Sequence, residues 1–171
     1  MGLKADRYIR SDRIDVYLNE AATRGHIVTK STLASGVALD NVANLGTLAA
    51  NPSGTRPLGV LLGDMVDIDV TREFLNTQQD KTVKGGKMRL VTEGWIVTDE
   101  IGVGTVTAGE AAYVGASGQF ASASMIENWT GGVGVPNPPT EETNATSFPM
   151  VGRFDTSKDQ NDYARITINI T

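Results

Sequence analysis

Apolar and polar residues alternate with a period of two over several stretches of this 171-residue chain. Such alternation is typical of strands with one buried side and one solvent-facing side, whereas an amphipathic helix repeats its apolar residues every three or four positions. The clearest stretches are residues 58–62, 66–70, 88–98 and 164–170. The sequence therefore predicts an all-β protein whose body is a small β-barrel or β-sandwich.

Glycine marks the places where these strands turn or bend. The residues Lys-Gly-Gly-Lys at 84–87 predict a hairpin turn between two alternating stretches. Gly94 stands inside the stretch 88–98 and predicts a β-bulge, at which the strand bends. Turns at 108–110 and 117–119 leave room for one short strand at 111–114, and residues 71–81 have the pattern of a short helix.

The domain organisation predicted from the sequence is an extended N-terminal arm at residues 1–20 followed by one β-rich domain at residues 21–171. Residues 1–30 carry six Lys or Arg and four Asp or Glu, whereas the remainder of the chain is acidic. Residues 5–24 fit either a strand or a helix that ends at Gly25, and a strand is favoured because an apolar stretch follows at hairpin distance. Residues 34–57 and 126–149 are predicted to be long loops, rich in Ala, Gly and Asn in the first and in Gly and Pro in the second.

The composition excludes most catalytic chemistry. The chain has no cysteine and a single histidine, which rules out disulfides, thiolate nucleophiles and metal centres built from several histidines. It contains neither a phosphate-binding P-loop nor a nucleophile elbow. We therefore expect no catalytic residue, no cofactor and no metal site, and we interpret His26 as a structural or surface residue beside a turn.

Two groups of acidic residues remain as candidates for acid/base catalysis or ion binding. Asp64, Asp67 and Asp69 could act as an acid/base cluster, although their alternation with apolar residues favours the solvated side of a strand. Residues 155–162 space their oxygen atoms like a calcium loop, but Gln160 and Ile166 occupy positions where such a loop needs Gly and Glu. A net charge of −5 argues against a nucleic-acid partner, and no apolar run approaches the length of a membrane helix.

Several segments of the chain together resemble the capsid decoration (cement) proteins of tailed bacteriophages. These segments are residues 19–28, 35–40, 50–54, 57–66, 85–87, 94–98, 108–118 and 151–154. The resemblance implies a non-enzymatic virion protein, made in the host cytoplasm, that binds the major capsid protein on the outer capsid surface and stabilises the head lattice. It also implies a homotrimer on the capsid, since many such proteins sit at threefold positions.

The partner-binding residues expected under this interpretation lie in the arm and in the second long loop. They are Arg7, Tyr8, Ile9, Ile14, Val16, Leu18 and Trp129. Apolar residues of the arm would add a strand to a neighbouring chain, and Trp129 would either anchor an interface or cover the mouth of the barrel. Two other functions stay open at this point: a host-surface or glycan-binding module that uses Trp129, and a small enzyme that uses Asp64, Asp67 or Asp69.

Overall fold

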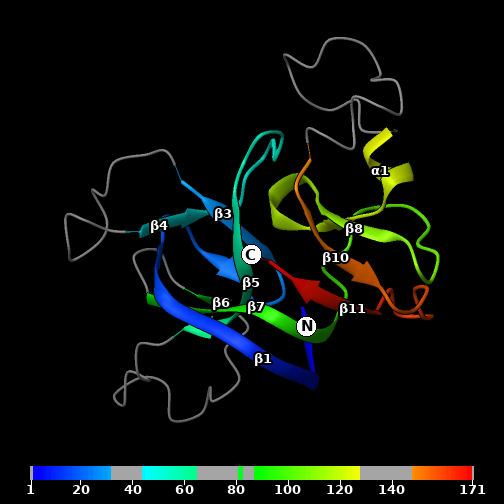
Figure 1. Ribbon diagram of the computed structural model, residues 1–171, viewed down its shortest axis with the longest axis horizontal. Coiled ribbons are helices and arrows are strands. Elements are labelled where there is room, and N and C mark those ends of the chain that lie inside the picture. The colour runs from blue at the N-terminus through cyan, green and yellow to red at the C-terminus, as the bar shows by residue number, and fades with distance from the viewer. Residues whose placement is uncertain (1, 32–43, 65–80, 83–86, 128–147, 171) are drawn as a thin grey trace.

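The structure, a computed structural model, describes residues 2–31, 44–64, 81–82, 87–127 and 148–170 (Figure 1). Its strands are β1 (Leu3–Leu18), β2 (Ala22–Thr23), β3 (Ile27–Lys30), β4 (Asn44–Thr47), β5 (Pro57–Asp64), β6 (Lys81–Thr82), β7 (Lys87–Thr98), β8 (Ala111–Val114), β9 (Phe120–Ala121), β10 (Met150–Phe154) and β11 (Ala164–Asn169). In these described ranges the only helical elements are a 3-10 turn, η1 (Ala116–Gly118), and the short helix α1 (Ala123–Glu127). The predicted all-β fold is confirmed.

Nine of the strands form one sheet in the order β1-β4-β3-β5-β7-β11-β10-β8-β9, and β2 pairs with β6 in a separate two-stranded ribbon. Neighbouring strands are antiparallel except β1 and β4, which are parallel. β1 also pairs with β7, so the pairings β1-β4-β3-β5-β7 return to the strand from which they start. Closure of the sheet into a barrel stays a prediction.

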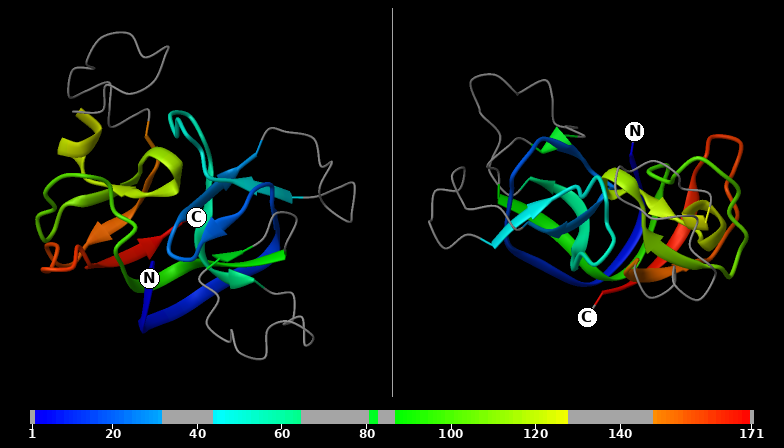
Figure 2. Two further views of the ribbon diagram at one scale, coloured as in Figure 1. Left: turned by 180° about the vertical axis from the view of Figure 1, so that it is seen from behind. Right: turned by 90° about the horizontal axis from the view of Figure 1, so that it is seen from above.

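β7 organises the molecule because its two halves have different partners along one edge. Its first half, Met88–Val91, pairs with β5, and its second half, Glu93–Thr98, pairs with β11. β1 runs along the other edge of β7 for nearly its whole length. Figure 1 shows the result, with β3, β4 and β5 on one side of the molecule and β8, β10 and β11 on the other. Figure 2 shows the same division from behind and from above.

Each side of the molecule has its own group of buried side chains. The larger cluster lies under β10 and β11 and includes Phe120, Phe154, Ile166 and Ile168, together with Ile96 from β7. The smaller cluster lies between β1, β3, β5 and β7; its buried members are Val16, Leu18, Ala22, Val28, Leu58, Leu61, Met88 and Leu90. Burial of these alternating apolar residues supplies the main driving force for folding.

β1 belongs to the body of the protein, and the prediction of a separate arm at residues 1–20 is wrong. Leu3 pairs with Thr98 and Tyr17 with Lys87, so backbone hydrogen bonding to β7 extends along the strand. Leu3, Val16 and Leu18 are buried. The strand preference for residues 5–24 is confirmed, since β1 and β2 occupy this region and no helix forms in it.

The bulge predicted at Gly94 is also confirmed. The register between β1 and β7 shifts between Ile9, which lies opposite Gly94, and Ser11, which lies opposite Glu93. Gly94 has φ +145°, and a Cβ atom at this position would overlap the carbonyl oxygen of Tyr8. Only glycine lets the two backbones approach so closely in this conformation.

Other local predictions have mixed outcomes. The strand predicted at 111–114 is β8, and the last alternating stretch is β11. The loop predicted at 34–57 is interrupted by β4, which the sequence did not indicate because this four-residue strand contains Gly46 and has no alternation. Helix α1 reaches into the loop predicted at 126–149. Residues 66–70, the helix predicted over most of 71–81 and the turn at 84–86 lie outside the described residues, although Lys81 belongs to β6.

Candidate interaction surface

The residues expected to bind a partner fall into two groups that differ in exposure. Arg7 and Tyr8 are exposed, Ile9 is half-buried against the larger cluster, and Ile14 is 45% exposed. Val16 and Leu18 are fully buried in the smaller cluster. As they stand, these last two side chains stabilise this chain and are not available to a partner, so their assignment as partner-binding residues is corrected.

Three other candidates cannot be placed on this surface. Trp129 lies outside the described residues, and so do Asp67 and Asp69. Asp64 is the last residue of β5, where its backbone lies opposite Met88 of β7. Among the expected partner-binding residues, those that the structure describes and leaves exposed all lie on β1.

The solvent-facing side of the sheet carries a row of side chains that crosses four strands. Tyr8 of β1 lies opposite Trp95 of β7, Trp95 lies opposite Thr167 of β11, and Thr167 lies opposite Arg153 of β10. Residues directly opposite each other on paired strands project on the same side of a sheet. Tyr8 is 55% exposed and Trp95 is half-buried. The sheet thus presents two aromatic side chains and an arginine in one line.

Trp95 is held in place by charged neighbours. The guanidinium carbon of Arg165 lies 4.1 Å from the centre of the Trp95 ring, within the range of a cation–π interaction. Arg165 Nε donates a hydrogen bond to Asp155 Oδ2 at 3.1 Å, and Thr167 Oγ1 donates to the same oxygen at 2.8 Å. Asp155 therefore fixes the arginine over the indole. We call Tyr8, Trp95, Arg165 and Thr167 the aromatic face.

Sequence reasoning missed Trp95 and Arg165 as candidate site residues. The alternation along β11 did carry a usable signal, because it places Arg165 and Thr167 on the side of the strand opposite the buried Ile166 and Ile168. What it could not show is that β7 and β11 are neighbours with Trp95 opposite Thr167. That information exists only once the strands have paired.

The start of β1 is tied to the loop between β10 and β11. Lys4 Nζ lies 3.3 Å from Asp159 Oδ2 and 3.9 Å from the centre of the Tyr163 ring. Asp159 also accepts hydrogen bonds from the backbone amides of Tyr163 and Asn161, and these bonds, with a further contribution from Lys4, lower the pKa of its carboxyl group. Two carboxylates of the segment 155–162, Asp155 and Asp159, are therefore engaged by neighbours within the chain.

Several ion pairs lie along the middle of β1. Arg10 Nη1 donates to Glu93 Oε1 at 2.6 Å, and Arg89 pairs with Asp12. Arg13 forms two hydrogen bonds of 2.6 Å with the carboxylate of Asp15, which raise the pKa of the guanidinium. These side chains are mostly exposed to solvent, so each pair contributes little to stability. Their main consequence is the arrangement of positive and negative side chains along β1.

The single histidine lies in a partly buried polar contact. His26 Nδ1 donates to the carbonyl oxygen of Thr23 at 2.9 Å, and His26 Nε2 lies 3.2 Å from Glu100 Oε2. Burial raises the pKa of Glu100, while the charge of His26 acts in the opposite direction. The contact joins the loop before β3 to the residue pair that follows β7, which agrees with a structural role for His26.

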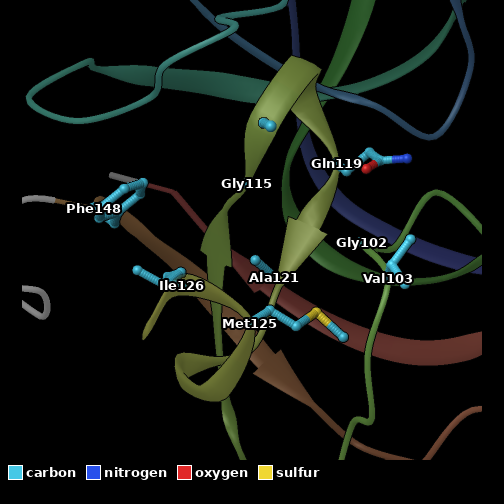
Figure 3. Close-up of a pocket in the computed structure, with 9 residues that line it drawn as sticks. Gly102, Val103, Gly115, Gln119, Ala121, Met125, Ile126 and Phe148 are labelled. Carbon is cyan, nitrogen blue, oxygen red and sulfur yellow. The ribbon is translucent and has the colours of Figure 1, made fainter. Parts of the chain in front are cut away.

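A mostly apolar pocket of about 280 Å³ lies beside α1 (Figure 3). Met125 and Ile126 of α1, Phe148 and Val103 contribute its apolar lining, and Gln119 contributes an amide. Val103 is fully exposed at 102%. The lining residues that the structure describes carry no ionisable side chain, so they offer neither a general acid nor a general base.

Within residues 2–31, 44–64, 81–82, 87–127 and 148–170, no three His, Cys, Asp or Glu side chains are arranged to hold a metal ion. The helices in these ranges are all too short or too polar to cross a membrane. The chain matches no protein-family model, and no curated protein matches it.

Proposed function

We propose that this chain is a non-enzymatic decoration protein that binds the outer surface of a tailed-phage capsid and stabilises the head lattice. The observation that carries the proposal is the aromatic face, which combines the exposed Tyr8 with the half-buried Trp95 and the Arg165 stacked on it, on the outside of the sheet. Aromatic residues and arginine are enriched at protein–protein interfaces and dominate the energy of binding. The segment resemblance supplies the class of partner, which is the major capsid protein.

The aromatic face is arranged so that little ordering is needed when a partner binds. Trp95 is constrained by the guanidinium of Arg165, which is itself constrained by Asp155. Side chains that are already fixed lose less conformational entropy on binding than mobile ones. The arrangement therefore lowers the entropic cost of binding a partner, with Tyr8 at the margin of the contact.

The proposed mechanism is mechanical. Each copy would bridge neighbouring capsid subunits and contribute a modest contact energy, and the head would gain stability from the many equivalent copies on its lattice. Such multiple contacts resist heat and osmotic shock although no single contact is strong. Copies bound to the capsid as homotrimers would add contacts between one another.

The experiment compares particles of the phage that encodes this chain with particles that lack it. Purified wild-type protein should bind the deficient particles and restore their resistance to heat. Trp95→Ala should lower the affinity for the particles by tenfold or more, because truncation of a central interface tryptophan costs about 2–4 kcal/mol. Arg165→Ala should weaken binding as well, whereas Arg56→Ala provides a matched control, since Arg56 is exposed on the loop before β5.

Urea unfolding of each variant separates loss of binding from loss of folding. Deficient particles that withstand heat as well as complete ones would contradict the proposal. Binding of the free protein to host cells, together with an infectivity defect of the deficient particles, would instead indicate the host-surface or glycan-binding module.

A further inference from the structure

One edge of β1 is not occupied by another strand over most of its length in the part of the chain that the structure describes. β7 lies along one edge from Leu3 to Tyr17, whereas β4 lies along the opposite edge only from Val16 to Leu18. Figure 1 shows β1 at the lower margin of the molecule, where its first half borders no other coloured strand than β7. The edge formed by residues 3–15 therefore presents backbone amides and carbonyls that a further strand can pair with.

The side chains along this edge are complementary to themselves. We propose that β1 pairs in antiparallel fashion with β1 of a second copy of the chain, around a twofold axis at Ser11. In this register Arg7 lies opposite Asp15 of the second copy and Arg10 lies opposite Asp12. Within one chain Arg10 pairs with Glu93, Asp12 with Arg89 and Asp15 with Arg13, so the contacts with the second copy add to these ion pairs or replace them. Opposite charges at directly opposed positions stabilise an antiparallel pair, and like charges destabilise it.

The same register also pairs the exposed apolar side chains of β1. Tyr8 lies opposite Ile14 of the second copy, and Ile14 lies opposite Tyr8, by symmetry. Their exposed fractions are 55% and 45% in the isolated chain. Contact between an aromatic and a β-branched side chain across two strands is one of the favourable cross-strand pairs. Pairing around Ser11 therefore buries both apolar groups and matches the charges at once.

Neighbouring registers are disfavoured by the same residues. A shift by one position in one direction places Asp6 opposite Asp15, and the opposite shift places Arg10 opposite Arg13. A shift by three positions in one direction keeps unlike charges opposed, but it places Tyr8 opposite Ser11 and Ile14 opposite Ala5, so less apolar surface is buried. The opposite shift also keeps unlike charges opposed, but it needs Val16 and Tyr17, whose edge is already paired with β4. Charge, apolar burial and the position of β4 together therefore favour the register around Ser11.

β1 is irregular close to the proposed axis, so pairing between the copies is expected to be less regular there than in an ideal ladder. The register shifts against β7 at Ile9–Ser11 and again at Ser11–Asp12, on either side of Ser11. Both copies therefore bend close to the proposed axis. A contact that uses the same surface on both copies closes as a dimer and does not grow into a filament.

The dimer is expected to be weak. Two paired strands bury less surface than the about 1,200–2,000 Å² of stable complexes, so the dimer should form at high protein concentration and dissociate on dilution. The dimer shares Tyr8 with the aromatic face, but its test does not depend on capsid binding, because the association of two copies is measured with the purified chain alone. It also differs from the homotrimer implied by the resemblance.

A cysteine at the axis tests the pairing directly. Ser11→Cys puts the only thiol of the chain opposite its own symmetry mate, and directly opposed residues of antiparallel strands lie within the Cα separation that a disulfide requires. Ser157→Cys is the matched control, since Ser157 is also exposed but lies in the loop between β10 and β11. In a glutathione buffer, Ser11→Cys should form covalent dimers at least fivefold faster than Ser157→Cys. Equal rates would overturn the proposal.

Charge reversal tests the register without a covalent bond. Arg7→Asp places two acidic side chains opposite each other and should raise the dimer dissociation constant tenfold or more in sedimentation equilibrium. The double variant Arg7→Asp with Asp15→Arg restores the unlike pair and should recover dimerisation. A wild-type protein that stays monomeric at millimolar concentration, a trimer, or a double variant as impaired as the single one would refute the twofold pairing.

Discussion

Replacement of Leu18 by alanine tests whether β1 is part of the folded body. The Leu18 side chain is 0% exposed and packs in the smaller cluster with Met88 and Leu90 of β7. Truncation of a buried leucine removes its transfer free energy and leaves a cavity, at a cost of about 2–5 kcal/mol. For a protein of this size, a loss of about 3 kcal/mol lowers the melting temperature by about 6–12 °C.

Ile14→Ala is the matched control on the same strand. Its side chain is 45% exposed, so its truncation should change the free energy of unfolding by less than about 1 kcal/mol. Both variants are compared with the wild type by urea unfolding, at protein concentrations low enough to keep the chain monomeric. Leu18→Ala unfolding at the same urea concentration as the wild type would show that β1 does not pack in the body. Equal losses of unfolding free energy for the two variants would show that the difference in burial between Leu18 and Ile14 does not determine how much each contributes to the stability of the protein.

Two further predictions follow from local geometry. Gly94→Ala should lower the free energy of unfolding, measured in urea, by about 1–3 kcal/mol, since a Cβ atom there overlaps the Tyr8 carbonyl oxygen and φ is +145°. Gly54→Ala should cost less, because Gly54 has space for a Cβ atom at φ +69°. Equal losses for the two variants would refute the overlap argument. The raised pKa of Glu100 means that the folded state holds its proton more tightly than the unfolded state does, so this group's contribution to stability is full below the unfolded pKa and is lost as pH rises through the folded pKa. Glu100→Gln cannot titrate and should therefore not show this loss of stability. The difference in unfolding free energy between wild type and variant should change with pH between the unfolded-state and folded-state pKa of Glu100. A difference that stays constant with pH would contradict the prediction.

The alternation of apolar residues was sufficient to predict the fold class and several strands. β11 appears where the alternation placed it, because a half-buried strand needs an apolar residue at every second position whatever its neighbours are. β8 appears between the two predicted turns that left room for one short strand. Gly94 was identified as a bulge for an equally local reason, since a glycine inside a strand usually marks a close approach of two backbones. Composition likewise narrowed the chemistry, because a chain without cysteine and with one histidine can form neither a thiolate nucleophile nor a metal centre built from several histidines.

Only the tertiary structure decided the role of β1 and the position of the aromatic face. Charged residues and bulges interrupt the apolar alternation of residues 3–15, so the sequence does not show that β1 packs in the body. β1 joins the body by pairing with β7, which lies about eighty residues further along the chain. Trp95 and Arg165 come together because β7 and β11 are neighbours, and Val16 and Leu18 are buried because β5 and β7 cover them. Pairing between distant strands depends on the whole set of contacts in the fold, whereas the period of a strand is a property of its own residues.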